Sequence, residues 1–296
     1  MNMKKVVIGI GMVVAVLFAV WLFSAPSENT SNLNKAETVS SLKDAHGLAV
    51  DRKNSSKVYI ATHTGLLVMN NDGSELQRVG TAKDDYMGFS AHPSDPNIFY
   101  SSGHPSTGGN IGFQKSNDGG STWQKIAEGV GGPVDFHTMA VSQAEPSIVY
   151  GVYRGQLQRS NNEGKDWQLV QSSLADPIVL ATSPTSKDTL YAGTTEGLMI
   201  SQNQGADWSK LNLDKAVVAL AVNPKNEQQI VAYSEGQGLV LSNDGGKSWN
   251  KLGNYAESIV MHLAYDVQNP SVIYLINKNL EIYKTTDGGN VWTKVR

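Results

Sequence analysis

The sequence predicts an all-β fold, a six-bladed β-propeller of four-stranded antiparallel blades, preceded by one N-terminal transmembrane helix. Five of the six tryptophans end copies of one phrase, and these copies recur 44, 41, 41 and 43 residues apart. Between the copies, short β-branched and aromatic segments alternate with turn residues, as strands do. A repeat of about 42 residues that holds four strands is typical of a propeller blade.

The first element is an apolar run at residues 6–23, which follows Lys4 and Lys5. Its length is about the minimum for a helix that spans a bilayer. The lysines predict that the N-terminal end lies in the cytoplasm. A cleaved signal peptide is the alternative, but cleavage after Ala25 would put bulky Phe23 where a small residue is favoured.

We therefore expect residues 1–25 to form a cytoplasmic stub and membrane anchor, or else a signal peptide. Residues 26–43 are predicted to be a polar linker, with one short strand at Glu37 to Leu42. The propeller would occupy residues 44–296. The predicted location is the cell membrane, single-pass with the propeller outside the cytoplasm, or secreted if the N-terminus is cleaved.

Each blade begins with a short inner strand, and six such strands can be counted. They are Gly47 to Val50, Gly88 to Ala91, Thr138 to Val141, Val179 to Thr182, Ala219 to Val222 and His262 to Tyr265. A turn, two further strands, the Trp phrase and a fourth strand follow. The first repeat has a degenerate phrase with Leu76 in place of Trp. Six blades account for the chain better than seven.

The phrase has the pattern S/T-x-D-x-G-x-x-W, and its copies run from SNDGGSTW at Ser116 to TTDGGNVW at Thr285. It resembles the Asp-box (BNR) repeat of the sialidase and sortilin superfamily, and of secreted bacterial propellers described as glycosyl hydrolases. The acidic side chain can bond the turn's own amides, and the Trp can bury its ring between blades. The structural residues expected are Asp118, Trp123, Trp167, Trp208, Asp244, Trp249, Asp287 and Trp292.

Composition excludes several classes of function. The net charge is −3 without a basic run beyond the extreme N-terminus, which argues against nucleic acid as a partner. The chain contains no cysteine, so disulfides, thiolate metal sites and a cysteine nucleophile are excluded.

Histidines gather on the blade face opposite the Asp-box turns, where sialidase-like relatives hold their active site. His46, His137 and His262 begin inner strands, whereas His63 and His104 lie in loops between second and third strands. When the repeats are aligned, Met87 and Met261 occupy the position just before the inner strand that His46 occupies in the first repeat. Copper would suit imidazole with thioether donors, and zinc would suit several imidazoles. The metal hypothesis therefore places His46, His63, His104 and His137 on one ion. One alternative is that these side chains only pack between blades. The other is a metal-free ligand pocket, lined by the same four residues together with His262 and Arg154.

A sialidase is improbable, because that family grips its substrate with three arginines and only Arg154 lies in a loop of this face. A different glycoside hydrolase needs two facing carboxylates. Asp135, two residues before His137, and Asp85 are the candidates we would test first; Asp84, Glu196 and Glu235 share the face. The alternative for all five carboxylates is that they are solvated surface groups without a catalytic role.

Ligand or partner binding on the histidine-bearing face is the first prediction for function. The partner would be a glycan or a protein, in addition to the membrane, because a rigid disc with variable loops suits docking. Glycoside hydrolysis and copper or zinc binding are the alternatives.

Overall fold

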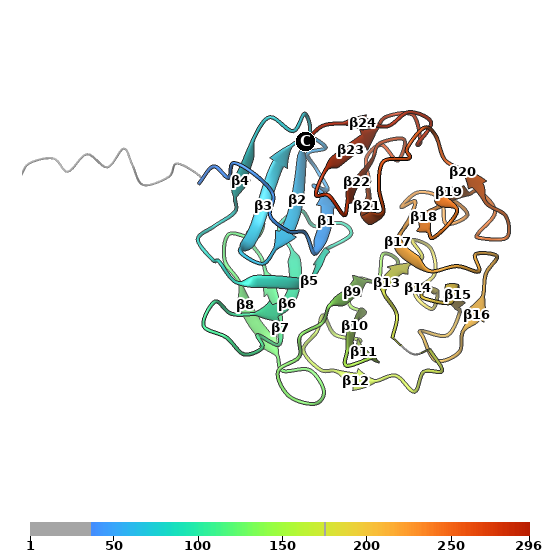
Figure 1. The fold of residues 1–296 in the computed structure, drawn as a ribbon. Coiled ribbons are helices and arrows are strands. Elements are labelled where there is room, and N and C mark those ends of the chain that lie inside the picture. Colours follow the sequence, from blue (N-terminus) through green and yellow to red (C-terminus); the bar gives the residue numbers. More distant parts are fainter. Residues whose placement is uncertain (1–36, 175) are drawn as a thin grey trace, which may run out of the picture. The chain divides into compact units, whose positions relative to one another are not determined.

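The computed structural model describes residues 37–174 and 176–296. These residues form six four-stranded antiparallel sheets, arranged as blades around a central axis (Figure 1). In every sheet the strand order follows the chain, so each blade is one contiguous segment. The predicted all-β propeller of six four-stranded blades is confirmed.

The strands of the six blades are as follows. Blade 1 contains β1 (Gly47–Val50), β2 (Lys57–Thr62), β3 (Gly65–Asn70) and β4 (Leu76–Arg78), and blade 2 contains β5 (Asp85–Ala91), β6 (Phe99–His104), β7 (Phe113–Ser116) and β8 (Gln124–Ala127). Blade 3 contains β9 (Thr138–Val141), β10 (Val149–Tyr153), β11 (Gln156–Ser160) and β12 (Gln168–Leu169), and blade 4 contains β13 (Val179–Thr182), β14 (Leu190–Thr194), β15 (Gly197–Ser201) and β16 (Ser209–Lys210). Blade 5 contains β17 (Val217–Val222), β18 (Ile230–Ser234), β19 (Gly238–Ser242) and β20 (Asn250–Lys251), and blade 6 contains β21 (Val260–Tyr265), β22 (Ile273–Asn277), β23 (Ile282–Thr285) and β24 (Thr293–Lys294).

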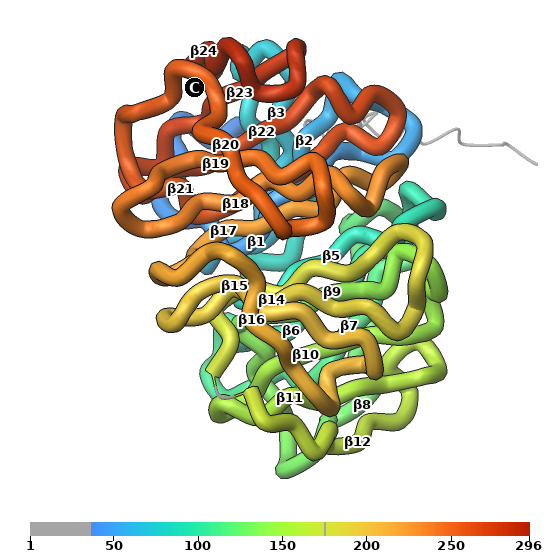
Figure 2. The backbone as a smooth tube through the Cα atoms, turned by 90° about the vertical axis from the view of Figure 1, so that its right-hand side faces the viewer, coloured from blue at the N-terminus to red at the C-terminus, as the bar shows by residue number. Residues whose placement is uncertain are grey.

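The first strands of the blades form a closed ring. Each contacts the first strand of the next blade, and β21 of blade 6 contacts β1 of blade 1. Figure 2 gives the side view, in which the sheet of blade 5 lies between those of blades 4 and 6. Six separate apolar clusters fill the spaces between neighbouring sheets, so the core is distributed around the ring.

The Asp-box Trp residues pack into these inter-blade clusters. Trp167 contacts Phe113 and Phe136, with ring centroids 5.1 and 4.8 Å apart. The box glycine permits this close approach, because Gly164 has a φ of 83° and a Cβ there would lie 1.9 Å from the Phe113 ring. Glycine adopts such a backbone without steric cost. In the degenerate box of blade 1, Leu76 is buried in the equivalent cluster between blades 6 and 1.

The side chains of each Asp box also form hydrogen bonds with the backbone amides of their own turn. The Ser242 hydroxyl accepts a hydrogen bond from the Gly246 amide at 2.8 Å, and Asp244 accepts one from the Ser248 amide at 2.9 Å. The Ser248 hydroxyl donates to the same carboxylate, and these bonds lower the pKa of Asp244 to about 2. Trp249 donates its indole N–H to the Gly246 carbonyl at 3.2 Å. The turn is thus a local staple that joins the third and fourth strands.

The segment before blade 1 lies along the outer strand β4. Thr38 forms an antiparallel bridge with Gln77, and the Val39 amide donates to the Leu76 carbonyl at 2.8 Å. This pairing is shorter than the strand expected at Glu37 to Leu42. Within residues 37–174 and 176–296, no helix is long and apolar enough to cross a membrane. The predicted transmembrane segment at residues 6–23 lies outside the described residues.

Candidate functional site

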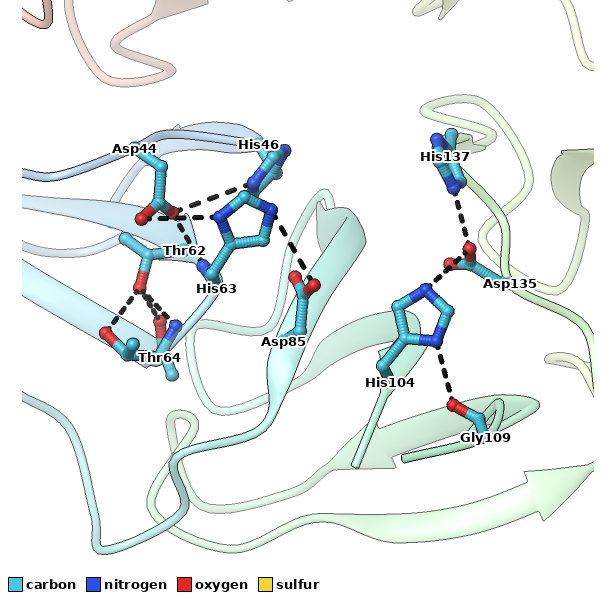
Figure 3. A network of polar contacts seen from close by, with 11 residues as sticks. Asp44, His46, Thr62, His63, Thr64, Asp85, His104, Gly109, Asp135 and His137 are labelled. Atoms are coloured by element: carbon cyan, nitrogen blue, oxygen red, sulfur yellow. Dashed lines mark hydrogen bonds and ion pairs between the residues drawn. The ribbon is translucent and has the colours of Figure 1, made fainter. Parts of the chain in front are cut away.

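The candidate site lies where the inner strands begin, on the face opposite the Asp-box turns. We call this the histidine face, defined by His46, His63, His104 and His137 (Figure 3). Among the described residues, two groups of histidine and aspartate have side-chain atoms close enough to share an ion. The structure therefore brings the four histidines together in two pairs, each with its own aspartate.

The first group, cluster A, consists of Asp44, His46 and His63, and all three belong to blade 1. His46 Nε2 lies 3.6 Å from the Asp44 carboxylate, and His63 Nδ1 lies 3.5 Å from it. The backbone amide of His63 donates to Asp44 at 2.6 Å, which fixes the carboxylate against the β2–β3 turn. The two imidazole rings are in contact, with centroids 4.1 Å apart.

Burial and charge set the protonation of His46. Burial lowers its pKa, and the neighbouring His63 lowers it further, whereas Asp44 and Asp85 oppose that change. His46 therefore stays neutral at physiological pH and presents a lone pair. In contrast, the His63 side chain is half exposed.

The second group, cluster B, consists of His104, Asp135 and His137, and it joins blades 2 and 3. His137 Nε2 lies 2.6 Å and His104 Nε2 lies 3.1 Å from the same oxygen of Asp135. The Asp135 side chain is only 8% exposed, so both imidazoles face a nearly buried carboxylate. His104 Nδ1 lies 2.8 Å from the Gly109 carbonyl of the β6–β7 loop.

Asp85 lies between the two clusters, at the start of β5. Its carboxylate is 3.7 Å from His63 Nε2. Burial raises the pKa of Asp85, while the charges of His63, His46 and His104 lower it and that of Asp135 raises it. The pKa of Asp85 therefore depends on charged groups in both clusters. The neighbouring Asp84 accepts a hydrogen bond from the Ser106 amide at 2.9 Å and so holds the β6–β7 loop.

A channel of about 260 Å³ runs along the axis inside the ring of inner strands. His46 and His137 line its mouth on the histidine face, together with Ile178 and Met261. Ile178 and Met261 are 38% and 43% exposed, which is unusual for large apolar side chains. The mouth therefore combines imidazole groups from blades 1 and 3 with apolar groups from blades 4 and 6.

Comparison with known proteins agrees with this architecture. A family model described as Sortilin-Vps10, "Sortilin, neurotensin receptor 3", matches residues 155–257. The GH74 xyloglucanase of Xanthomonas campestris has a similar fold, with a TM-score of 0.56 and 15% identity over 84% of this chain and 45% of that chain. The fold is a β-propeller of the sialidase and sortilin type.

Other solved structures have a similar fold. An ancestral GH74 enzyme has a TM-score of 0.57 and 14% identity over 88% of this chain and 40% of that chain. A structure of YCF48 bound to D1 peptide has a TM-score of 0.55 and 15% identity over 88% of this chain and 84% of that chain. The chain thus spans less than half the length of these GH74 enzymes. No curated protein matches the sequence.

Two further candidate residues of the propeller belong to neither cluster, although His262 lies beside cluster A. His262 donates from Nε2 to the Ala45 carbonyl at 2.9 Å, a bond that links blade 6 to blade 1. Burial lowers the pKa of His262, so this ring is neutral and its N–H closes the ring of blades. Arg154 is exposed in the turn between β10 and β11 and lies over the Tyr153 ring.

Sequence reasoning missed Asp44, although a signal for it exists. Asp44 stands two residues before His46, Asp85 two before Met87 and Asp135 two before His137. Because neighbouring blades place equivalent positions side by side, this spacing sets three carboxylates along one arc of the histidine face. The repeated Asp-x-His pattern at two inner strands would have predicted the Asp44–His46 and Asp135–His137 pairs, but not the addition of His63 and His104.

Proposed function

We propose that this propeller binds a polypeptide partner on its histidine face, at the mouth of the central channel. The observation that carries the proposal is the exposure of Ile178 and Met261 at this mouth, at 38 and 43%, with Ile259, two residues before Met261, exposed at 38%. Exposed apolar side chains grouped beside polar ones are typical of an interaction site.

A polypeptide fits this surface better than a glycan does. None of the large exposed hydrophobic side chains in the described residues is aromatic. These side chains therefore offer no flat ring on which a sugar could stack. Met261 is flexible and polarizable, a property of surfaces that adapt to peptide side chains. The likeness in fold to YCF48, whose structure holds a D1 peptide, supports the same choice.

Peptides selected from a displayed random library against the full-length chain test the proposal. Binding should weaken at least about tenfold in Ile178→Asp and Met261→Asp, because each places a charge in the contact. Val291→Asp is the matched control, since Val291 is 54% exposed but lies in the Asp box of blade 6. Equal binding by all four proteins would refute the histidine face as the binding surface.

Glycoside hydrolysis is the second candidate, and Asp85 favours it. Burial raises the pKa of Asp85, as a general acid requires, while Asp135 lies beside two imidazoles. Hydrolysis of xyloglucan or aryl glycosides should then disappear in Asp85→Asn and in Asp135→Asn. Activity should also decline as pH rises, because Asp85 loses its proton. Unchanged turnover in both variants would eliminate this candidate.

The proposal includes a location outside the cytoplasm, on a membrane anchor formed by residues 6–23. The apolar run and the lysines before it support this placement. The chain should remain in the membrane pellet after alkaline carbonate extraction, and added protease should digest the propeller in intact spheroplasts. Release into the soluble fraction at full length would contradict the anchor, and a mature protein lacking residues 1–25 would indicate cleavage instead.

A further inference from the structure

We propose that clusters A and B are two separate sites for divalent transition-metal ions of the zinc and copper class, one ion in each. In each group, three ligand atoms from two histidines and one aspartate lie within 4.8 Å of one another. This assignment differs from one ion held by four histidines, and it stands independently of the polypeptide partner.

The hydrogen bonds of His104 call for a positive charge in cluster B. His104 Nδ1 faces the Gly109 carbonyl, which can only accept, so Nδ1 must carry the proton. A neutral ring then has a bare lone pair on Nε2, yet this atom lies 3.1 Å from the Asp135 carboxylate. Two acceptors at this distance repel each other unless a proton or a metal ion lies between them.

His63 presents the same conflict in cluster A. Its Nδ1 lies 3.5 Å from Asp44 and its Nε2 lies 3.7 Å from Asp85, so both nitrogens face carboxylates. A neutral imidazole has only one N–H to offer. One extra positive charge is therefore needed here as well. A metal ion bound to His63 Nδ1 and Asp44 would supply it, and the N–H at Nε2 could then be donated to Asp85.

Buried polar atoms without partners point to the same positions. Among the described residues, His46 Nε2, Asp85 Oδ1 and Asp135 Oδ1 are buried without a hydrogen-bond partner. Such atoms are costly to bury and usually mark a missing water or ion. His46 Nε2 is a ligand atom of cluster A, and Asp135 Oδ1 is the second oxygen of the carboxylate in cluster B, so each proposed site has an unsatisfied polar atom.

The distances in cluster A fit a tetrahedral ion. Metal bonds of ~2.0–2.2 Å place neighbouring ligand atoms about 3.3–3.5 Å apart. The observed separations from Asp44 are 3.6 Å to His46 Nε2 and 3.5 Å to His63 Nδ1. Two imidazole nitrogens and one carboxylate oxygen suit zinc or copper, and three protein ligands leave a fourth position for water or a partner's side chain.

Outer contacts that orient metal-binding histidines are also present. Asp85 lies beside the second nitrogen of His63, and the Gly109 carbonyl accepts from the second nitrogen of His104. Carboxylates and backbone carbonyls are the usual partners of ligating histidines, because they set the tautomer and the ring orientation. Asp85 is thus a positioning residue for cluster A.

Zinc titration of the chelator-treated full-length chain, followed by calorimetry, tests the proposal. We expect two ions per chain for the natural protein. His46→Ala/His63→Ala should bind one ion, through cluster B, and His104→Ala/His137→Ala should bind one, through cluster A. His92→Asn is the matched control and should bind two, because His92 lies at the end of an inner strand away from both clusters. Circular dichroism verifies that each variant is folded.

Asp85→Asn separates metal coordination from simple packing. It should weaken the ion in cluster A about 10- to 100-fold and leave cluster B unchanged. Cobalt substitution should give the intense visible bands of a four-coordinate site, and each double variant should remove about half of the intensity. Binding of no zinc by the natural protein would overturn the proposal, as would NMR spectra showing His63 and His104 doubly protonated in the presence of zinc. Identical stoichiometry in the natural protein and both double variants would also overturn it.

Discussion

At the residue scale, His92 shows how a histidine can serve structure alone. Its Nδ1 accepts hydrogen bonds from the Ser94 amide at 3.2 Å and the Asp95 amide at 3.0 Å. In blade 1 the same position is Asp51, whose carboxylate accepts from two backbone amides at 2.8 Å. His92 therefore does the work of an Asx turn, and its ring nitrogen replaces a side-chain oxygen.

Replacing His92 tests this role. His92→Asn should change the free energy of unfolding by less than about 0.5 kcal/mol, whereas His92→Ala should cost about 1 kcal/mol, since two amides lose their acceptor. Denaturant unfolding measures both values. Equal losses in the two variants would show that the ring contributes by packing.

The contribution of His92 should also depend on pH. Burial lowers the pKa of His92 below its ordinary value of 6.5, while Asp95 and Glu163 oppose the change and Lys115 and Arg52 reinforce it. A depressed histidine pKa gives stability that is present above the unfolded value and is lost as pH falls through the folded value. The advantage of the natural protein over His92→Ala should therefore shrink below about pH 6.5, and His92→Asn should show no such trend.

At the element scale, the Asp boxes come in two chemical versions. In blade 2, Asp118 accepts from the Thr122 hydroxyl at 2.6 Å. In blade 3, Asn162 stands in the acidic position and donates from its amide to Asp166 at 2.8 Å. Donor and acceptor have changed places across the same turn. Blade 4 repeats the second version with Asn203 and Asp207.

The two versions predict a non-additive pair of substitutions. Asn162→Asp should destabilise the protein by about 1 kcal/mol, because a donor is lost and two carboxylates face each other. Asn162→Asp combined with Asp166→Thr recreates the blade 2 version and should recover most of that loss. Unfolding free energies of the two single variants and the double variant give the coupling, expected to exceed about 0.5 kcal/mol. Simple additivity would contradict the exchange of roles.

At the scale of the whole propeller, the ring closes without a shared strand among the described residues. Arg296 instead bridges blade 6 and blade 1. Its guanidinium donates to the Gly73 carbonyl at 2.9 Å and to the Ser40 carbonyl at 2.9 Å, and its own carbonyl accepts from Ile282 at 2.9 Å. The bond from His262 to Ala45 joins the same two blades nearer the axis.

Arg296→Ala should therefore weaken one junction of the ring selectively. The loss of two hydrogen bonds from a charged donor should cost about 2 kcal/mol. Hydrogen exchange should accelerate in β4 and in residues 37–40 before it does in blades 3 and 4. Lys294→Ala, on the adjacent surface, removes only an exposed ion pair with Glu281 and should leave exchange unchanged. Uniform acceleration around the ring would contradict closure through Arg296.

The sequence by itself determined the architecture of this protein. The Trp spacing, six inner strands and Asp-box residues predict blade number and strand order, because each blade is a contiguous unit whose turn is satisfied by residues a few positions apart. The anchor at residues 6–23 stays a prediction.

Only the tertiary structure decided the make-up of the site. It divides the four histidines into two clusters, adds Asp44, places Asp85 between them and uses His262 to join blades 6 and 1. The Asp135 partner of His104 and the Asp85 partner of His63 come from neighbouring blades, 31 and 22 residues away in the sequence. Spacing within one repeat cannot show which side chains converge across blades, because convergence depends on how far each loop reaches and how adjacent sheets pack.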